Sequence, residues 1–134
     1  MGLKGTGKTK HLIDLVNVAI DEEKGNVICV ELGKKLTYDV SYRARLIDIS
    51  HFQISNFDML RGFISGLYAG NYDISHIFID NIFKVSGSSS IAEADEFILW
   101  LENFSKDNGV RFTVTISAPV EDAGENIKKF LQVI

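Results

Sequence analysis

Short apolar runs, separated by helical or irregular segments, are the feature that most limits how this chain can fold. We predict strands at Val27–Val30, Leu46–Ile49, His76–Asp80 and Val110–Ala118. The first and third runs have almost no polar residues inside them, which is typical of strands in a parallel sheet that is covered on both faces. The pattern therefore predicts an α/β fold, a three-layer sandwich with helices on both sides of a parallel sheet.

Local signals locate helices in the second half of the chain. Ser55 with Asp58, and Ser90 with Glu93, have the spacing of capping boxes, so we predict that helices begin there. Pro119 predicts the start of a last helix. These signals place one helix before the third strand, one before the fourth and one after it.

The composition favours one domain over residues 1–134, because 46 % of the residues are hydrophobic, enough for a core. No apolar run reaches the roughly 18 residues of a membrane helix, so we expect no membrane partner. Met1 precedes Gly-Leu-Lys-Gly instead of an apolar signal core, and Cys29 is the only cysteine; both observations predict a cytoplasmic protein. The net charge of −4 argues against a nucleic-acid partner.

One segment near the start has a pattern with a known chemistry. Gly2-Leu-Lys-Gly-Thr-Gly-Lys-Thr9 fits G-x-x-x-x-G-K-[ST], the Walker A pattern of a phosphate-binding loop, at every fixed position. Glycines permit a turn in which backbone N–H groups point at a phosphate. A helical stripe follows at once, from Leu12 to Ile20, and the positive end of that helix would face the same anion.

The motif assigns a role to each residue type. Lys8 would bring positive charge to the β- and γ-phosphates, and Thr9 would offer a hydroxyl to Mg²⁺. We prefer ATP to GTP because the chain has no Asn-Lys-x-Asp motif for reading guanine. The residues expected to bind the nucleotide are Gly2, Lys4, Gly5, Thr6, Gly7, Lys8 and Thr9.

A Mg²⁺ ion at such a loop also needs a carboxylate at the end of a neighbouring strand. Asp80 follows Ile77–Ile79 and has this form, whereas Asp48 follows Leu46 and Ile47. We prefer Asp80, because its apolar run is cleaner and a full helix separates it from the preceding strand. The sequence therefore predicts Thr9 and Asp80 as metal ligands, and Lys8 and Asp80 as the catalytic residues.

On these residues the chain resembles the P-loop NTPase superfamily, most closely at Gly2–Thr9 and more loosely at Ile77–Asp80. It is also similar to small, uncharacterised ATP-binding proteins of clostridial-type bacteria, whose loop reads Gly-Pro-Lys-Gly-Ser-Gly-Lys-Thr; here Leu3 stands in place of the proline. Such proteins are sometimes labelled twitching-motility ATPases. Motors of that class are far longer and have a further domain, so their function is not carried over.

The chain departs from the superfamily pattern at its start. A phosphate-binding loop normally follows a buried strand, whereas Gly2 here comes directly after Met1. We expect either a true start that lies upstream, which we favour, or a sheet that lacks this strand. A gap in the sheet would leave backbone groups unpaired, at a large cost. A rearranged strand or a partner chain, such as a second copy in a homo-oligomer, would then have to complete the sheet.

The second departure concerns the water-activating base. Many hydrolysing P-loop ATPases have a glutamate after the strand-end aspartate, but Asn81 follows Asp80 here, and asparagine cannot act as a general base. Other polar residues that follow strands could act at the site: Glu31, Asp48, His51 and Ser117. Each of them could equally be a solvated loop residue or a helix cap.

These observations predict Mg²⁺-dependent binding of ATP, or of another nucleoside triphosphate, with slow hydrolysis. A small-molecule kinase is the first alternative, but such kinases usually have an arginine-rich lid, and no arginine cluster follows Asp80. The second alternative is a nucleotide-dependent interaction module, or an inactive fragment, without turnover.

Overall fold

Four parallel strands form one sheet in the computed structural model, which describes residues 1–3, 5–33, 39–41 and 43–131. In the order β2-β1-β3-β4 across the sheet, the strands are β2 (Arg45–Asp48), β1 (Asn26–Glu31), β3 (Ile74–Ile79) and β4 (Arg111–Val114). Val30 lies opposite both Ile47 and Ile79, and Ile79 lies opposite Val114. The carboxyl ends of all the strands therefore lie at the same edge of the sheet.

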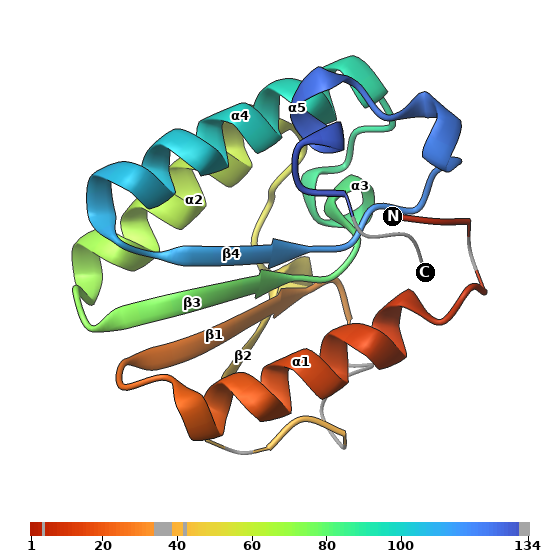
Figure 1. Cartoon of the computed structure of the whole chain (residues 1–134). Coiled ribbons are helices and arrows are strands. Elements are labelled where there is room, and N and C mark those ends of the chain that lie inside the picture. Colours follow the sequence, from red (N-terminus) through yellow and green to blue (C-terminus); the bar gives the residue numbers. More distant parts are fainter. Residues whose placement is uncertain (4, 34–38, 42, 132–134) are drawn as a thin grey trace.

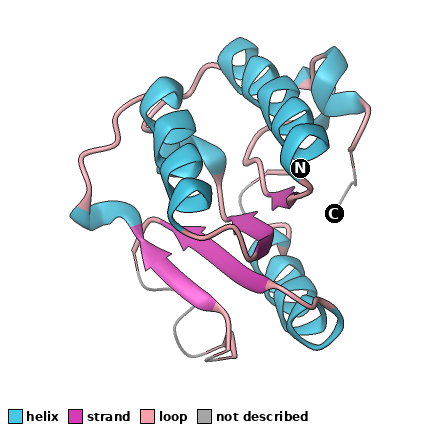
Figure 2. Ribbon diagram, turned by 90° about the vertical axis from the view of Figure 1, so that its left-hand side faces the viewer, coloured by secondary structure: helices cyan, strands magenta, loops and turns pink. Residues whose placement is uncertain are grey.

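Helices cover both faces of this sheet. The helical elements are α1 (Lys8–Glu22), α2 (Phe57–Gly70), α3 (Ile82–Ser86), α4 (Ile91–Asn108), α5 (Glu125–Lys128) and the 3-10 turns η1 (Ile49–His51) and η2 (Val120–Asp122). Helix α1 lies on one face, and α2 and α4 lie on the other (Figure 1). The view turned by 90° shows the same layers (Figure 2). The predicted α/β class with a parallel sheet is confirmed.

The core has two parts, one on each side of the sheet. Cys29 and Phe78 pack with Leu12 of α1, whereas Ile28 and Ile77, one position away on the same strands, pack with the helices on the other face. Side chains alternate between the two faces of a strand. Both faces of β1 and β3 are therefore buried, and this explains why their sequences are continuously apolar.

Two of the local predictions were wrong in detail. The N-cap of α2 is Asn56, whose side chain accepts from the Met59 N–H at 2.8 Å, and not Ser55. Pro119 precedes only the 3-10 turn η2, and the single turn of α5 follows after Gly124, so no continuous last helix forms. The cap at Ser90 is confirmed, because its hydroxyl accepts from the Glu93 N–H at 3.2 Å.

The sheet has no gap between its described strands, because β3 pairs directly with both β1 and β4. The start of the chain contacts the segment that follows β4. Gly2 N–H donates to the Ile116 carbonyl, and the Ala118 N–H donates to the Gly2 carbonyl, both at 3.1 Å. This parallel bridge between Gly2 and Ser117 is all that the described residues provide in place of a strand before the loop.

Gly25, between α1 and β1, is required by a close approach of two segments. A Cβ at this position would collide with the backbone carbonyl oxygen of Asp73 and would lie 2.9 Å from Ser75 Cβ. We expect Gly25→Ala to lower the free energy of unfolding by about 2 kcal/mol, because a backbone atom cannot move aside cheaply. Urea denaturation measures this change.

The matched control for this prediction is Gly62→Ala. Gly62 lies within α2, and no atom lies within 4 Å of a Cβ built there. Alanine is the better helix former, so this variant should gain about 1 kcal/mol. An unchanged stability of Gly25→Ala would contradict the close approach.

Candidate functional site

The loop before α1 has the backbone conformation that its glycines permit. Gly5 and Gly7 have φ values of 86° and 88°, a region that other residues rarely adopt. Gly7 is the N-cap of α1 and has no side chain to accept from the N–H groups of the first turn. Those groups have no partner within the helix and point toward the loop, so the loop and the helix together offer N–H donors to an anion.

Lys8 is held at the loop although it is charged. Its side chain is buried, with 6 % of the residue exposed. Nζ donates to the Leu3 carbonyl at 2.7 Å and to Thr6 Oγ1 at 3.5 Å. Burial lowers the pKa of Lys8, and the charge of Asp80 opposes this shift. The ammonium group is therefore fixed close to where the motif predicts phosphates.

Thr9 lies against Asp80, as the sequence predicts for two ligands of one metal ion. Thr9 Oγ1 donates to the Asp80 carboxylate at 3.3 Å and 3.4 Å from its two oxygens. Asp80 follows β3 directly, and its N–H donates to the Val30 carbonyl at 3.0 Å, which fixes the backbone. A hydroxyl and a carboxylate are hard oxygen ligands, so this pair fits Mg²⁺, whose remaining ligands are usually phosphates and water.

Thr115, which the sequence analysis did not single out, completes this group. Its hydroxyl donates to Asp80 Oδ1 at 3.0 Å and accepts from the Asn81 N–H at 2.6 Å. The residue is buried and follows β4, next to β3. In the sequence, Thr115 is one of the polar residues that alternate with Phe112, Val114 and Ile116, and nothing in that pattern distinguishes it from Thr113.

These residues surround a cavity of about 350 Å³ at the carboxyl ends of β3 and β4. Lys8, Lys10 and Lys84 bring positive charge, and Asp80 is the one carboxylate among its described lining residues. The full lining consists of Gly5, Gly7, Lys8, Thr9, Lys10, Leu32, Asp80, Asn81, Lys84, Thr115 and Ser117. Such a cavity suits a polyanion that brings a divalent cation with it.

The other predicted residues have different surroundings. Gly2 pairs with the segment after β4, Thr6 donates to Leu3, and Lys4 lies outside the described residues. Glu31 is buried at the end of β1 and, like Asp48 and His51, does not line the cavity. Ser117 does line it. Asn81 also lines it, with φ of 59°, and its side chain caps α3 by accepting from the Lys84 N–H at 3.4 Å.

Asp48, the alternative metal ligand, has a structural role. Its Oδ1 accepts from the N–H groups of Ser50, at 2.9 Å, and Gly33, at 2.8 Å. These backbone hydrogen bonds lower the pKa of Asp48 to about 2. Since the folded pKa is below the ordinary value, the ionised carboxylate stabilises the fold above about pH 4, and this contribution is lost as the pH falls toward 2.

We therefore expect Asp48→Asn to be less stable than the unmodified chain at neutral pH, with a difference that shrinks below about pH 4. Urea midpoints measured at several pH values test this. Asp58→Asn is the control, since Asp58 is an exposed carboxylate in the first turn of α2. A difference that is the same at pH 7 and pH 3 would show that the Asp48 carboxylate does not act through its charge.

No group of three or more His, Cys, Asp or Glu side chains in the described ranges is placed so that it could hold a metal ion. No described helix has the length and apolar character needed to cross a membrane. In comparisons with protein-family models, curated proteins and solved structures, nothing matched this chain.

Proposed function

We propose that this protein binds ATP together with Mg²⁺ in the cavity between the glycine loop and the ends of β3 and β4, and that it hydrolyses ATP slowly. The observation that carries the proposal is the contact between Thr9 and Asp80, at 3.3 Å, from segments 71 residues apart. It puts a hydroxyl and a carboxylate side by side in the cavity that the glycine loop and Lys8, at the N-terminus of α1, also line. Each of these groups has the chemistry that a metal–triphosphate complex requires.

Positively polarised groups would contact the phosphates, and oxygen ligands would contact the metal ion. Lys8 and the N–H groups after Gly7 would face the phosphates, and Thr9 and Asp80 would hold the metal ion. When bound, Mg²⁺ would neutralise part of the phosphate charge. Thr115 would keep the Asp80 carboxylate in place through its 3.0 Å hydrogen bond, and is a positioning residue.

Slow turnover follows from the lining of the cavity. Among the described lining residues, Asp80 is the only carboxylate, and it is the expected metal ligand. Asn81 cannot accept a proton from water. The arrangement thus supports binding without rapid hydrolysis, and it keeps the nucleotide-dependent interaction module as the second candidate function.

A small-molecule kinase has less support, because the described lining contains lysines but no arginine. We also propose that the protein acts in the cytoplasm, where ATP and Mg²⁺ are abundant; the single cysteine is in keeping with that compartment.

Calorimetric titration with ATP tests the proposal, once with Mg²⁺ and once with a chelator. We expect micromolar binding with Mg²⁺ and weaker binding without it. AMP, which lacks the β- and γ-phosphates, should not compete. Absence of heat from a folded sample with Mg²⁺–ATP would refute the proposal, and phosphate release over hours would measure the turnover.

A further inference from the structure

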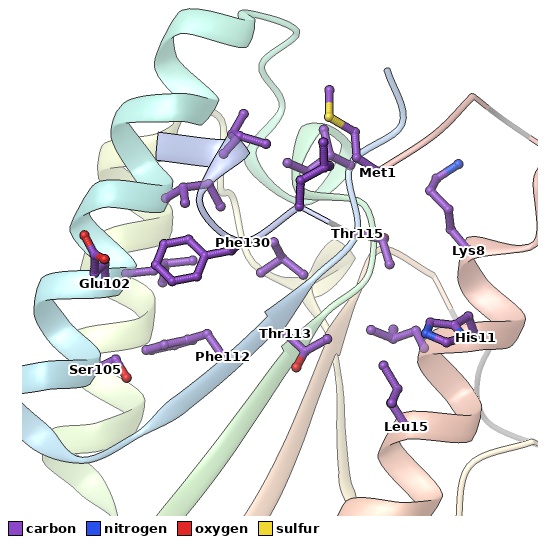
Figure 3. A pocket seen from close by; sticks show the side chains of 17 residues that line it. Met1, Lys8, His11, Leu15, Glu102, Ser105, Phe112, Thr113, Thr115 and Phe130 are labelled. Carbon is purple, nitrogen blue, oxygen red and sulfur yellow. The ribbon is translucent and has the colours of Figure 1, made fainter. Parts of the chain in front are cut away.

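A second cavity, of about 470 Å³, runs along the outer edge of β4. Figure 3 shows Thr113 of β4 in its wall, between Leu15 of α1 and Ser105 of α4. Much of the remaining lining is apolar and includes Leu101 and Phe112. A cavity of this size, with many apolar and few polar side chains, is typical of a site for a small molecule.

Thr113 begins a chain of hydrogen bonds that leads away from this cavity. Thr113 Oγ1 lies 2.9 Å from His76 Nε2, and His76 Nδ1 lies 3.3 Å from Glu23 Oε1. In the pairing of β3 with β4, His76 lies opposite Arg111, and Thr113 is two residues further along β4, on the same face. Glu23 is the C-cap of α1. Three segments thus bring a hydroxyl, an imidazole and a carboxylate together in this order.

The charges of these groups decide which atoms donate. Burial raises the pKa of Glu23, but hydrogen bonds, the largest of them from Arg111, hold that pKa below its ordinary value. Burial lowers the pKa of His76, and Glu23 opposes this shift only in part. At neutral pH the ionised Glu23 therefore accepts from the protonated Nδ1 of a neutral His76. Since Nε2 then has only a lone pair to offer, the Thr113 hydroxyl donates to it.

The surroundings of Thr113 and His76 also suit a nucleophile and its base. The His76 ring stacks on Phe78, with ring centroids 4.0 Å apart, and this fixes its orientation. Thr115 N–H donates to the Ile79 carbonyl, and successive residues of a parallel strand turn their backbone groups to opposite sides. The Val114 N–H therefore points away from β3, toward an edge with which no strand pairs in the described part of the chain. The N–H after a nucleophile is a known donor to the oxyanion of acyl transfer.

We propose that Thr113, His76 and Glu23 form a hydrolytic triad, which cleaves carboxylic esters whose apolar acyl group occupies the cavity beside β4. A hydroxyl, an imidazole and a carboxylate joined in this order perform acyl transfer on several unrelated folds. The apolar lining favours an apolar acyl group. None of the three residues lines the nucleotide cavity, so this activity does not depend on nucleotide binding.

The reaction has two steps that return the enzyme to its starting state. Thr113 Oγ1 forms a bond to the ester carbonyl carbon while its proton passes to His76 Nε2, and the Val114 N–H stabilises the negative carbonyl oxygen. His76 then gives this proton to the alcohol, which leaves as its C–O bond breaks. Water attacks the acyl-threonine by the same route, and the acid leaves as His76 returns a proton to Thr113. Glu23 is a positioning residue, because it touches His76 and not the ester.

Hydrolysis of p-nitrophenyl butanoate by the full chain is the first test. We expect Thr113→Val, which keeps the side-chain shape but lacks the hydroxyl, to lower the rate by at least about 100-fold. Thr113→Ser keeps a hydroxyl and should retain activity within about tenfold. The control is Ser65→Ala, which removes an exposed hydroxyl from α2, outside the cavity, and should leave the rate unchanged. Circular dichroism shows whether each variant folds.

A fluorophosphonate identifies the nucleophile in the unmodified chain, because it reacts with activated hydroxyls and stays attached. Mass spectrometry of the peptides should find the adduct on Thr113. An adduct on another residue would overturn the proposal, and so would a Thr113→Val variant as active as the unmodified chain. A folded chain that neither hydrolyses the ester faster than buffer nor forms the adduct would also refute it.

The pH dependence of hydrolysis tests the role of Glu23. Since the reaction requires neutral His76, the rate should fall as the pH drops through the His76 pKa. Among the charged groups near His76, Glu23 raises this pKa and Arg111 lowers it. Glu23→Gln should therefore move the fall in rate to lower pH. A fall at the same pH in this variant and in the unmodified chain would overturn the triad.

Discussion

Replacing Lys8 with alanine is expected to weaken the binding of Mg²⁺–ATP by about 100-fold, since hydrogen bonds to charged groups contribute roughly 1.5–3 kcal/mol each. The ammonium group is buried and held at the loop by Leu3 and Thr6, so its position is set before a ligand arrives. A pre-positioned charge loses little conformational entropy on binding. Calorimetric titration of the variant measures the loss.

Lys24→Ala is the control for this substitution. Lys24 is exposed and lies just beyond the far end of α1, so its loss removes the same charge without touching the loop. We expect its affinity for Mg²⁺–ATP to stay within about twofold of the unmodified chain. Circular dichroism of both variants should show that they fold. If the Lys8 and Lys24 variants bind equally well, the glycine loop is not the nucleotide site.

Replacing Asp80 with asparagine should abolish the effect of Mg²⁺ on ATP binding. Asparagine retains the size of aspartate and can still hydrogen-bond to Thr9 and Thr115, but it lacks the charge that a divalent cation requires. In the unmodified chain we expect Mg²⁺ to increase the affinity for ATP by at least about tenfold. In Asp80→Asn the titrations with Mg²⁺ and with a chelator should coincide.

Asp48→Asn is the control for Asp80→Asn, because it removes a carboxylate from the end of another strand of the same sheet. Asp48 is the last residue of β2 and Asp80 directly follows β3, but the Asp48 carboxylate accepts hydrogen bonds from backbone N–H groups outside the cavity. At neutral pH we expect this variant to retain the Mg²⁺ effect in full. Loss of the effect in Asp48→Asn, together with its retention in Asp80→Asn, would move the metal site to the end of β2.

The choice between these two aspartates shows what the sequence could predict. Both residues end apolar runs, and the sequence favoured Asp80 by its cleaner run and by the full helix that separates it from the preceding strand. The physical difference is the order of the strands, since β3 lies inside the sheet beside β4, whereas β2 lies at the far edge. Strand order depends on contacts between distant segments, which periodicity does not encode. The glycine loop, in contrast, is a contiguous segment, so its sequence alone predicted the positive φ values of Gly5 and Gly7.

Thr115 and Asn56 show two further features that local sequence pattern did not predict. Thr115 gains its role from Asp80, which is 35 residues away, and a threonine in an alternating strand has no local sign of such a partner. The cap of α2 lies one residue after the predicted one, at Asn56, because Asn56 and Ser55 are both good N-cap residues and the residue type does not distinguish them.

The buried position of Cys29 makes it a natural reporter of sheet opening. The thiol lies between α1 and the middle of the sheet, with 0 % of the residue exposed, and burial together with nearby Glu31 and Asp80 raises its pKa to about 12. An exposed thiolate is the nucleophile that reacts with alkylating reagents. Modification of this single thiol therefore requires an opening of the structure that exposes it, and the modification rate reports how readily that opening occurs.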